Sequence, residues 1–255
     1  MMKSKTGIAL LLALSISLGA CLDAEPVAKT HAGECVVLLH GLARSSLSME
    51  RMKWFLEDNG YQVANVDYPS RDFEIEKLAS MAIEDGLAQC AALGSGERVH
   101  FVTHSLGGIL VRYYFADNKL DSLGRVVMLA PPNQGSLAVD ELQDWPGFEW
   151  LNGPAGYQLG KGEGSIPLRL GNPDFEFAVI AGDESIDPVT SAVLPDPDDG
   201  RVSVSDTYLE GMADFRLVGS SHAFIMQSGE VFELVKSFLE TGKFPETHAD
   251  TESDR

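Results

Sequence analysis

The stretch VHFVTHSLGGILVRYYF, residues Val99 to Phe115, changes character in its middle. Val99–Thr103 is a nearly continuous apolar run, which is typical of a strand buried on both faces of a parallel sheet. After two glycines the apolar residues recur at helical spacing, so the pattern predicts a helix over Ile109–Asn118. Ser105 lies at the turn between the two. The stretch therefore predicts a strand-to-helix unit of an α/β sheet, with a serine just past the strand's carboxyl end.

The same alternation of strand and helix extends along the chain. Apolar runs predict six strands: Val36–His40, Val63–Asp67, Val99–Thr103, Arg125–Ala130, Phe175–Ala181 and Phe215–Val218. Helical spacing predicts helices between and after them: Leu47–Asn59, Ile75–Leu93, Ile109–Asn118 and Val231–Leu239. This order favours an α/β fold whose mostly parallel sheet of about six strands carries helices on both faces, joined by right-handed crossovers.

Two segments interrupt the alternation. From Pro131 to Asn172 the chain is rich in Gly, Pro and Trp and holds one short amphipathic piece, Leu137–Trp150. A connection of this length is usually functional, so we expect a cap or lid over residues 131–172. Asp183–Asp199, rich in Pro and Asp, predicts an irregular loop. The domain is expected over residues 35–244, followed by a polar, disordered tail over 245–255.

The first twenty residues predict an export signal. Met1–Lys5 is basic, and Ile8–Leu18 is an apolar run too short for a mature transmembrane helix. The sequence Leu18-Gly19-Ala20-Cys21 resembles a bacterial lipobox, where cleavage precedes a cysteine that receives lipid. We expect a signal peptide over residues 1–20, lipid on Cys21 and a tether over 21–34. The chain would then sit on an envelope membrane, on the periplasmic side of the outer one in a two-membrane organism; an ordinary secretory signal is the alternative.

Composition limits the partners. The 255 residues suffice for one α/β domain with a large core, which we expect to be a monomer. They carry 38 acidic and 19 basic side chains, a formal charge of −19. Nucleic-acid binding depends on clustered Lys and Arg, so no nucleic acid is expected. An acidic cluster without EF-hand spacing favours a solvated loop over a calcium site, and no metal is expected. Its members are Asp183, Asp187, Asp196 and Asp198.

Two further cysteines remain after Cys21. Cys35 opens the first predicted strand, and Cys90 ends the helix that leads into the third. Both positions lie at the same end of the sheet. Because exported proteins can oxidise their thiols, we expect a Cys35–Cys90 disulfide, with two free buried thiols as the alternative.

Ser105 is a candidate nucleophile. Where a buried strand turns sharply into a helix, a serine takes a strained conformation with its hydroxyl exposed, and the residues two positions away must be small. Gly107 meets this demand, whereas Thr103 departs from the glycine that is usual at its position. A serine that merely caps a helix is the alternative.

A second turn supplies candidate oxyanion donors. His40-Gly41-Leu42 comes at the end of the first predicted strand, which is expected to neighbour the strand before Ser105. A loop there can aim a backbone N–H at a developing oxyanion, together with the N–H of the residue after the nucleophile. We therefore expect the amides of Leu42 and Leu106 to form an oxyanion hole.

A serine nucleophile needs a histidine as base and a carboxylate that orients it, in the chain order Ser, Asp, His. His222 follows the last predicted strand at the catalytic edge, whereas the other histidines fall in chain ends, in a strand or in turns that would point them elsewhere. The acid stays open at this point between Asp183, at the end of a strand, and Asp199, with Asp198 as a third candidate.

Five motifs occur in a fixed order: HGL at 40–42, THSLGG at 103–108, APPNQGS at 130–136, DDGRV at 198–202 and the late histidine. In this order the chain from Val36 to Leu239 resembles the α/β-hydrolase superfamily, and within it small bacterial lipases and esterases. In that family an Asp-Gly-x-Val segment commonly carries the triad acid a little over twenty residues before the histidine. Asp199 fits, 23 residues before His222, with Asp183 as the alternative.

The resemblance implies hydrolysis of carboxylic esters through an acyl-enzyme, with a small ester or lipid as substrate and no cofactor. A thioesterase, amidase or acyltransferase on the same triad is one alternative, and a non-catalytic lipid-anchored binding protein is another. Apolar side chains of the expected cap could line an acyl pocket or simply cover the sheet. They are Leu137, Leu142, Trp145, Phe148, Trp150, Leu151 and Tyr157.

Overall fold

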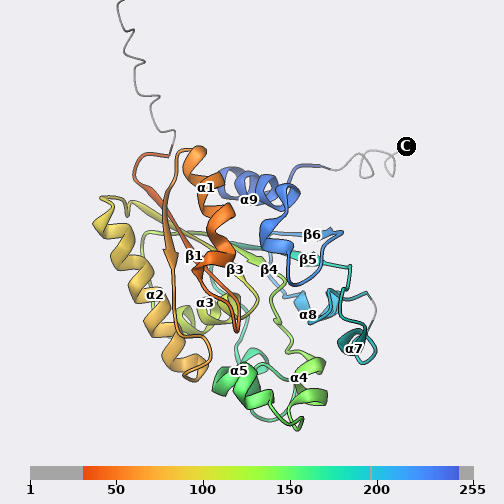
Figure 1. The fold of residues 1–255 in the computed structure, drawn as a ribbon. Helices are drawn as coiled ribbons and strands as arrows, with labels where there is room; N and C mark the ends of the chain where they lie inside the picture. Colours follow the sequence, from red (N-terminus) through yellow and green to blue (C-terminus); the bar gives the residue numbers. More distant parts are fainter. Residues whose placement is uncertain (1–30, 196, 247–255) are drawn as a thin grey trace, which may run out of the picture.

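The computed structural model describes residues 31–195 and 197–246. These residues fold around one parallel β-sheet of six strands (Figure 1). The strands lie in the order β2-β1-β3-β4-β5-β6, and every neighbouring pair is parallel. They are β1 (Glu34–Leu39), β2 (Gln62–Val66), β3 (Arg98–His104), β4 (Leu123–Leu129), β5 (Phe177–Gly182) and β6 (Asp214–Val218). The predicted α/β fold is confirmed.

Helices cover both faces of the sheet (Figure 1). On one face lie η1 (Ser46–Met49), α1 (Glu50–Asp58) and α9 (Gly229–Thr241); on the other lie α2 (Ile75–Ala92) and α3 (Leu106–Asp117). Shorter helices occur in the connections: α4 (Leu137–Leu142), α5 (Phe148–Tyr157), α6 (Ile166–Arg169), α7 (Pro188–Ser191), α8 (Val204–Thr207) and η2 (Ile225–Gln227). No helix within the described ranges is both long and apolar enough to cross a membrane.

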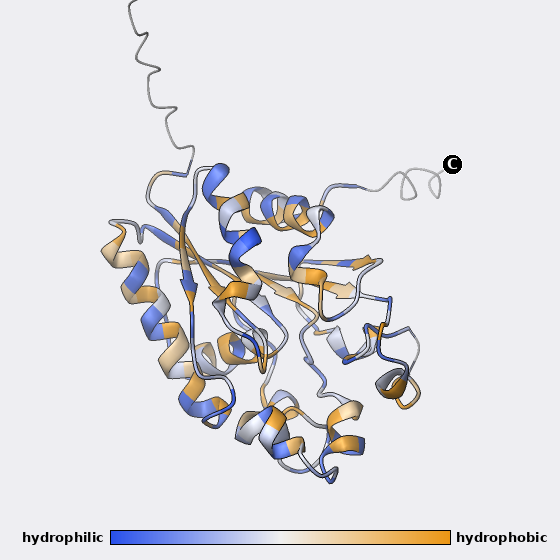
Figure 2. Cartoon of the chain, in the orientation of Figure 1, coloured by the Kyte–Doolittle hydropathy of each residue, from blue (hydrophilic) through white to orange (hydrophobic). Residues whose placement is uncertain are grey.

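The two faces of the sheet explain the unbroken apolar run of β1. Successive side chains of a strand point to opposite faces. Val37 and Leu39 pack beneath α2 and α3, whereas Val36 and Leu38 pack beneath α1 and α9, and all four are fully buried. Figure 2 shows the central strands mostly in the hydrophobic colour, with both colours on the surrounding helices.

The strand predictions hold to within two residues at each end, but three other predictions were wrong. α3 begins at Leu106 rather than at Ile109, because packing against the sheet outweighs the low helix propensity of the two glycines. The Asp183–Asp199 segment contains α7, whose first turn is capped by the side chain of Asp187. The single piece Leu137–Trp150 is two helices, because Gly147 adopts φ +102° between α4 and α5.

Arg112 of α3 forms hydrogen bonds near both ends of segment 131–172, the expected cap. The buried guanidinium donates to the backbone and side-chain oxygens of Asn133 (3.0 and 3.1 Å) near the start of the segment. It also donates to the carbonyls of Pro167 (3.2 Å) and Leu170 (3.3 Å) near the end. Burial lowers the pKa of Arg112 to about 10, so the group stays charged at neutral pH. From this base α4 and α5 project past the sheet, at the lower end of the view in Figure 1.

Cys35 and Cys90 form a disulfide with a Cα–Cα distance of 5.8 Å. It joins the start of β1 to the last turn of α2. The predicted signal peptide, Cys21 and the first part of the tether lie outside the described residues, as does most of the predicted tail.

Candidate active site

Ser105 lies at the junction of β3 and α3 in a strained conformation, with φ +51° and ψ −117°. Positive φ is rare for residues other than glycine and costs roughly 1–3 kcal/mol, so it persists only where the surroundings enforce it. Here the N–H of Ser105 donates to the carbonyl of Leu129 in β4 (2.8 Å), and its carbonyl accepts from Gly108 in α3 (3.0 Å). Strand and helix together therefore hold the sharp turn that the sequence predicted.

Two residues around this turn are glycine because neighbouring atoms leave no room for a side chain. A Cβ on Gly107 would lie 2.8 Å from the carbonyl oxygen of Leu39, and a Cβ on Gly41 would lie 3.3 Å from the Cβ of Ser105. Thr103, the departure from the usual motif, is buried, and its hydroxyl donates to the carbonyl of Val127 (3.4 Å). That hydrogen bond satisfies the extra polar atom, so the threonine is accommodated.

Three side chains from distant segments form a chain of hydrogen bonds at the carboxyl edge of the sheet. His222, which follows β6, has its Nε2 3.0 Å from the Oγ of Ser105 and its Nδ1 2.8 Å from the Oδ2 of Asp199. A carboxylate only accepts, so Nδ1 carries the proton. Nε2 is then free to accept the hydroxyl proton of Ser105.

Asp199 is fixed by several contacts. Its carboxylate is 1% exposed, and Oδ1 accepts from the backbone N–H groups of Arg201 (2.9 Å) and Val202 (2.8 Å). Its own carbonyl accepts from the N–H of His222 (2.9 Å). These bonds aim Oδ2 at the imidazole, as an orienting acid requires.

The other two candidate acids are not brought to the imidazole. Asp198 is buried, and its Oδ1 accepts from the hydroxyl of Ser191 and the N–H of Gly200, both at 2.7 Å, so it shapes the loop. Asp183 follows the end of β5, and nowhere in residues 31–195 and 197–246 does its side chain bond to His222.

His104 lies in the site, against the expectation that it points elsewhere. Its ring centroid is 4.8 Å from that of His222, and its Nε2 donates to the carbonyl of His222 (3.0 Å). Burial, and then the nearby His222, keep the pKa of His104 well below its ordinary value. A neutral ring therefore supports the loop of His222. Its adjacency to Ser105 in the sequence was the signal available for this placement.

The two predicted oxyanion donors are close to Ser105 in the sequence or through a neighbouring residue. Leu106 is the first residue of α3, and Leu42 follows Gly41, whose backbone abuts Ser105. Among the described residues, neither the N–H of Leu42 nor that of Leu106 donates a hydrogen bond to the protein. Neither amide is therefore committed to another acceptor within the described residues, as the predicted oxyanion hole requires.

A sequence profile of the alpha/beta hydrolase family matches residues 36–233, which include all of these side chains and the six strands except the first two residues of β1. The chain belongs to this family. No curated protein matches the sequence significantly.

Solved structures of other hydrolases share the fold of this one. The mature lipase of Bacillus licheniformis is similar with a TM-score of 0.64 and 20% identity over 82% of this chain and 91% of the lipase. An esterase from a Rhodococcus species has a TM-score of 0.53 and 17% identity, over 84% of this chain and 93% of the other. The phospholipase PlaB of Legionella pneumophila has a TM-score of 0.62 and 20% identity over 82% of this chain, which spans 57% of PlaB.

An open pocket of about 330 Å³ adjoins the hydrogen-bonded side chains of this hydrolase. His222 and Asp199 form part of its wall, together with Arg44, Ile186, Asp187, Pro188, Gly200, Arg201 and Ala223. Sequence reasoning missed Arg44, although it lies only two residues after the expected oxyanion donor Leu42.

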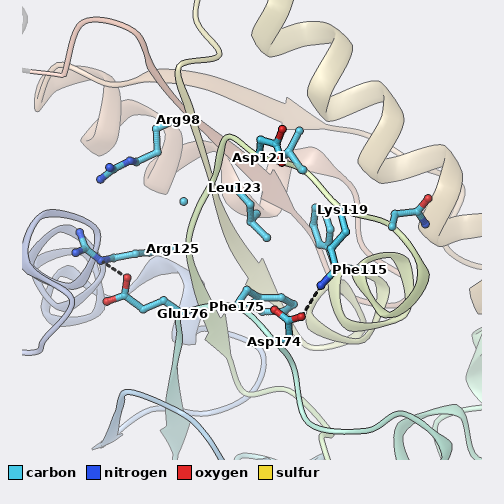
Figure 3. Close-up of a pocket in the computed structure, with 12 residues that line it drawn as sticks. Arg98, Phe115, Lys119, Asp121, Leu123, Arg125, Asp174, Phe175 and Glu176 are labelled. Atoms are coloured by element: carbon cyan, nitrogen blue, oxygen red, sulfur yellow. Dashed lines mark hydrogen bonds and ion pairs between the residues drawn. The ribbon is translucent and has the colours of Figure 1, made fainter.

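A larger pocket of about 500 Å³ lies at the opposite edge, beside the amino ends of β4 and β5 (Figure 3). Four of its six charged side chains form ion pairs, with Arg125 3.0 Å from Glu176 and Lys119 bonded to Asp174. Ligands of open α/β sheets bind at the carboxyl ends of strands, where the smaller pocket lies, so the smaller pocket is the candidate site.

The cap side chains expected to line an acyl pocket line neither of these two pockets. Trp145 and Trp150 are 68% and 79% exposed, whereas Phe148 is buried and its ring centroid lies 5.0 Å from that of Tyr157. The described parts of the chain also hold no group of three side chains suited to a metal ion. Asp196, one of the four acidic residues considered for calcium, lies outside them.

Proposed function

We propose that this alpha/beta hydrolase is a serine hydrolase that cleaves carboxylic esters through an acyl-enzyme, with Ser105, His222 and Asp199 as its catalytic triad. The unbroken chain of hydrogen bonds from Asp199 Oδ2 through His222 to Ser105 Oγ is the observation that carries the proposal. The lipase and esterase structures that share the fold support an ester as the substrate.

In the proposed reaction His222 removes the proton of Ser105 while the serine oxygen attacks the ester carbonyl. The amides of Leu42 and Leu106 stabilise the tetrahedral oxyanion, and the loss of one such donor raises the barrier by about 3–4 kcal/mol. The imidazolium, stabilised by Asp199, gives its proton to the leaving alcohol. Water, activated by the same imidazole, then releases the acid from Ser105.

Labelling with a fluorophosphonate tests the nucleophile, because the probe reacts with an activated serine. We expect the purified protein to be labelled, the Ser105→Ala variant to be unlabelled and the Ser122→Ala variant to be labelled as the wild type is. Ser122 accepts a hydrogen bond through its backbone at the other edge of the sheet. Folded wild-type protein that stays unlabelled would contradict the proposal and favour a binding protein.

Turnover of matched p-nitrophenyl esters, thioesters and amides tests the reaction class. We expect esters to be cleaved with the highest kcat/KM, and an ester series of increasing acyl length to report the acyl preference. A thioester or amide cleaved faster than its matched ester would replace the proposed substrate class.

We also propose that the enzyme is held on an envelope membrane by lipid on Cys21, which follows the sequence Leu18-Gly19-Ala20. Radiolabelled palmitate should be incorporated by cells that express the full chain and not by cells that express Cys21→Ser. Equal incorporation by the two would contradict the anchor.

A further inference from the structure

Two arginines line the pocket beside His222, although acidic side chains outnumber basic ones by two to one in the whole chain. Arg201 has its Nη2 3.3 Å from the Oδ2 of Asp187. Arg44 has no carboxylate within ion-pair distance anywhere in the described part of the protein. A cation in the same pocket wall as the imidazole and without an ion-pair partner is a contact for an anionic ligand.

The backbone positions Arg44 at this pocket. Arg44 lies two residues after Leu42, the expected oxyanion donor. The N–H of Arg44 donates to the carbonyl of Gly41 (3.3 Å) and closes a turn. Ala43 within that turn has φ +54°, a strained value for a residue with a side chain. The hydroxyl of Ser70 accepts from the N–H of Ala43 (3.1 Å) and helps to hold this conformation. Strain of this kind is concentrated at functional sites.

The two carboxylates of the same pocket form hydrogen bonds and ion pairs within the protein. Asp199 is bonded to His222 and to two backbone N–H groups. Asp187 caps α7 through the N–H groups of Val189 and Thr190 and is paired with Arg201. Arg44 is the cation of this pocket wall that forms no ion pair within the described residues, so its guanidinium is available to an anionic ligand.

The position of the pocket indicates which part of the ester it holds. His222 and Ala223 are in its wall, and Ser105 is not. The imidazole gives its proton to the leaving alcohol, so the alcohol part of the ester departs on the imidazole side of the serine. A group attached to that alcohol therefore extends into the pocket of Arg44.

We propose that this pocket binds an anionic group, phosphate or carboxylate, carried by the alcohol part of the ester, with Arg44 as the principal contact and Arg201 beside it. The inference rests on the proposed ester hydrolysis. In the reaction Ser105 forms a bond to the acyl carbon, the bond from that carbon to the alcohol oxygen breaks, and the alcohol leaves with the imidazole proton. The anionic group stays unchanged on the alcohol.

Four soluble substrates test the inference by release of acid in a pH-stat. They are 1-hexanoylglycerol, 1-hexanoylglycerol 3-phosphate, the hexanoyl ester of 4-hydroxybutanoate and 1-glutarylglycerol, which are neutral, phosphate-bearing, carboxylate-bearing and anionic on the acyl side. At low salt we expect kcat/KM to be about tenfold higher for the esters with an anionic alcohol than for the neutral ester. The phosphate and carboxylate arms show which anion the pocket prefers.

The variant Arg44→Gln should lower this preference, the ratio of kcat/KM for the anionic and neutral esters, about tenfold, and Arg44→Lys should retain part of it. Arg98→Gln is the matched control, because Arg98 is exposed at the far edge of the sheet and the change in net charge is the same. The preference should also weaken as salt is raised.

An equal preference in wild type and Arg44→Gln would overturn the inference while neutral-ester turnover upheld the enzyme's proposed function. A dependence on Arg44 for 1-glutarylglycerol, but not for the phosphate ester, would overturn the placement on the alcohol side. Wild-type protein that cleaves none of the four substrates and takes no fluorophosphonate would overturn the proposed function, and this inference with it.

Discussion

His222 and Asp199 are joined twice, by the Nδ1–Oδ2 contact of 2.8 Å between their side chains and by the backbone bond from His222 N–H to Asp199 O (2.9 Å). The backbone hydrogen bond does not depend on either side chain, so it can hold the two loops together when a side chain is substituted. Substitution of the carboxylate should therefore change the chemistry of the imidazole more than the fold around it.

We expect Asp199→Asn to lower kcat by about 10³- to 10⁴-fold, because the amide favours the wrong tautomer of the imidazole and cannot stabilise its charged form. Asp183→Asn should change kcat by less than about threefold, since its side chain makes no bond to His222. Steady-state kinetics on one ester, with thermal unfolding of each variant as a check on folding, measures both. A larger loss in Asp183→Asn would show that the acid is assigned wrongly.

Patterns in the sequence predicted the strands well because the sheet is buried on both faces, and such strands leave unbroken apolar runs. Ser105 and His222 could be inferred because both follow strands whose carboxyl ends meet at one edge. Asp199 was preferred to Asp183 because of the family resemblance, which places the acid in an Asp-Gly-x-Val segment a little over twenty residues before the histidine. Arg44 and His104 were missed for a physical reason. The placement of Arg44 depends on a loop conformation, the positive φ of Ala43, that leaves no periodic signal. His104 is the last residue of β3, and its place in the site depends on the distant loop of His222, to which it bonds.

The cap was predicted less well than the sheet. α4 has six residues and α5 has a break at Gly153, so neither has the several regular turns that reveal which face of a helix is buried. Trp145 and Trp150 were expected to face inward on hydrophobicity alone, and they are exposed. An exposed large apolar side chain is common on protein surfaces, so hydrophobicity could not settle the question.

The break in α5 predicts a difference between two glycines of the cap. Gly153 has φ +63°, and a Cβ there would lie 1.8 Å from the carbonyl oxygen of Arg71, whereas Gly147 has φ +102° with no atom within 4 Å of such a Cβ. We expect Gly153→Ala to lower the free energy of unfolding by roughly 2–4 kcal/mol, from overpacking and strain together. Gly147→Ala, with strain alone, should cost about 1 kcal/mol. Urea unfolding of the two variants makes the comparison, and equal losses would mean that α5 does not pack against Arg71.

The disulfide predicts a redox-dependent stability. Cys35 and Cys90 are 55 residues apart, and closing a loop of that length restricts the unfolded chain by about 4 kcal/mol in the chain-entropy estimate. Reductant should therefore lower the free energy of unfolding by about 2–4 kcal/mol, measured by urea denaturation with and without it. The double variant Cys35→Ala/Cys90→Ala is the control and should be insensitive to reductant. Wild-type protein equally insensitive to reductant would contradict the prediction.

His100 predicts a loss of stability in acid. Burial, above all, holds the pKa of His100 down to about 4, with Arg98, Arg125 and His31 lowering it further and Glu34 raising it. The unfolded chain, with an ordinary pKa of about 6.5, binds more protons than the folded chain between the two values. The contribution of His100 is therefore fully present above pH 6.5, and on the order of 3 kcal/mol is lost as the pH falls toward 4.

The variant His100→Asn isolates this contribution. The N–H of Arg125 donates to the Nδ1 of His100 (2.9 Å), and the Oδ1 of an asparagine can accept that bond without titrating. Urea unfolding at several pH values between 8 and 4 should show a shallower loss of stability in the variant than in the wild type. The other buried histidines, His40 and His104, also have lowered pKa values and are unchanged, so part of the slope should remain. If the two proteins lose stability in parallel over this window, His100 is not the group that is titrated.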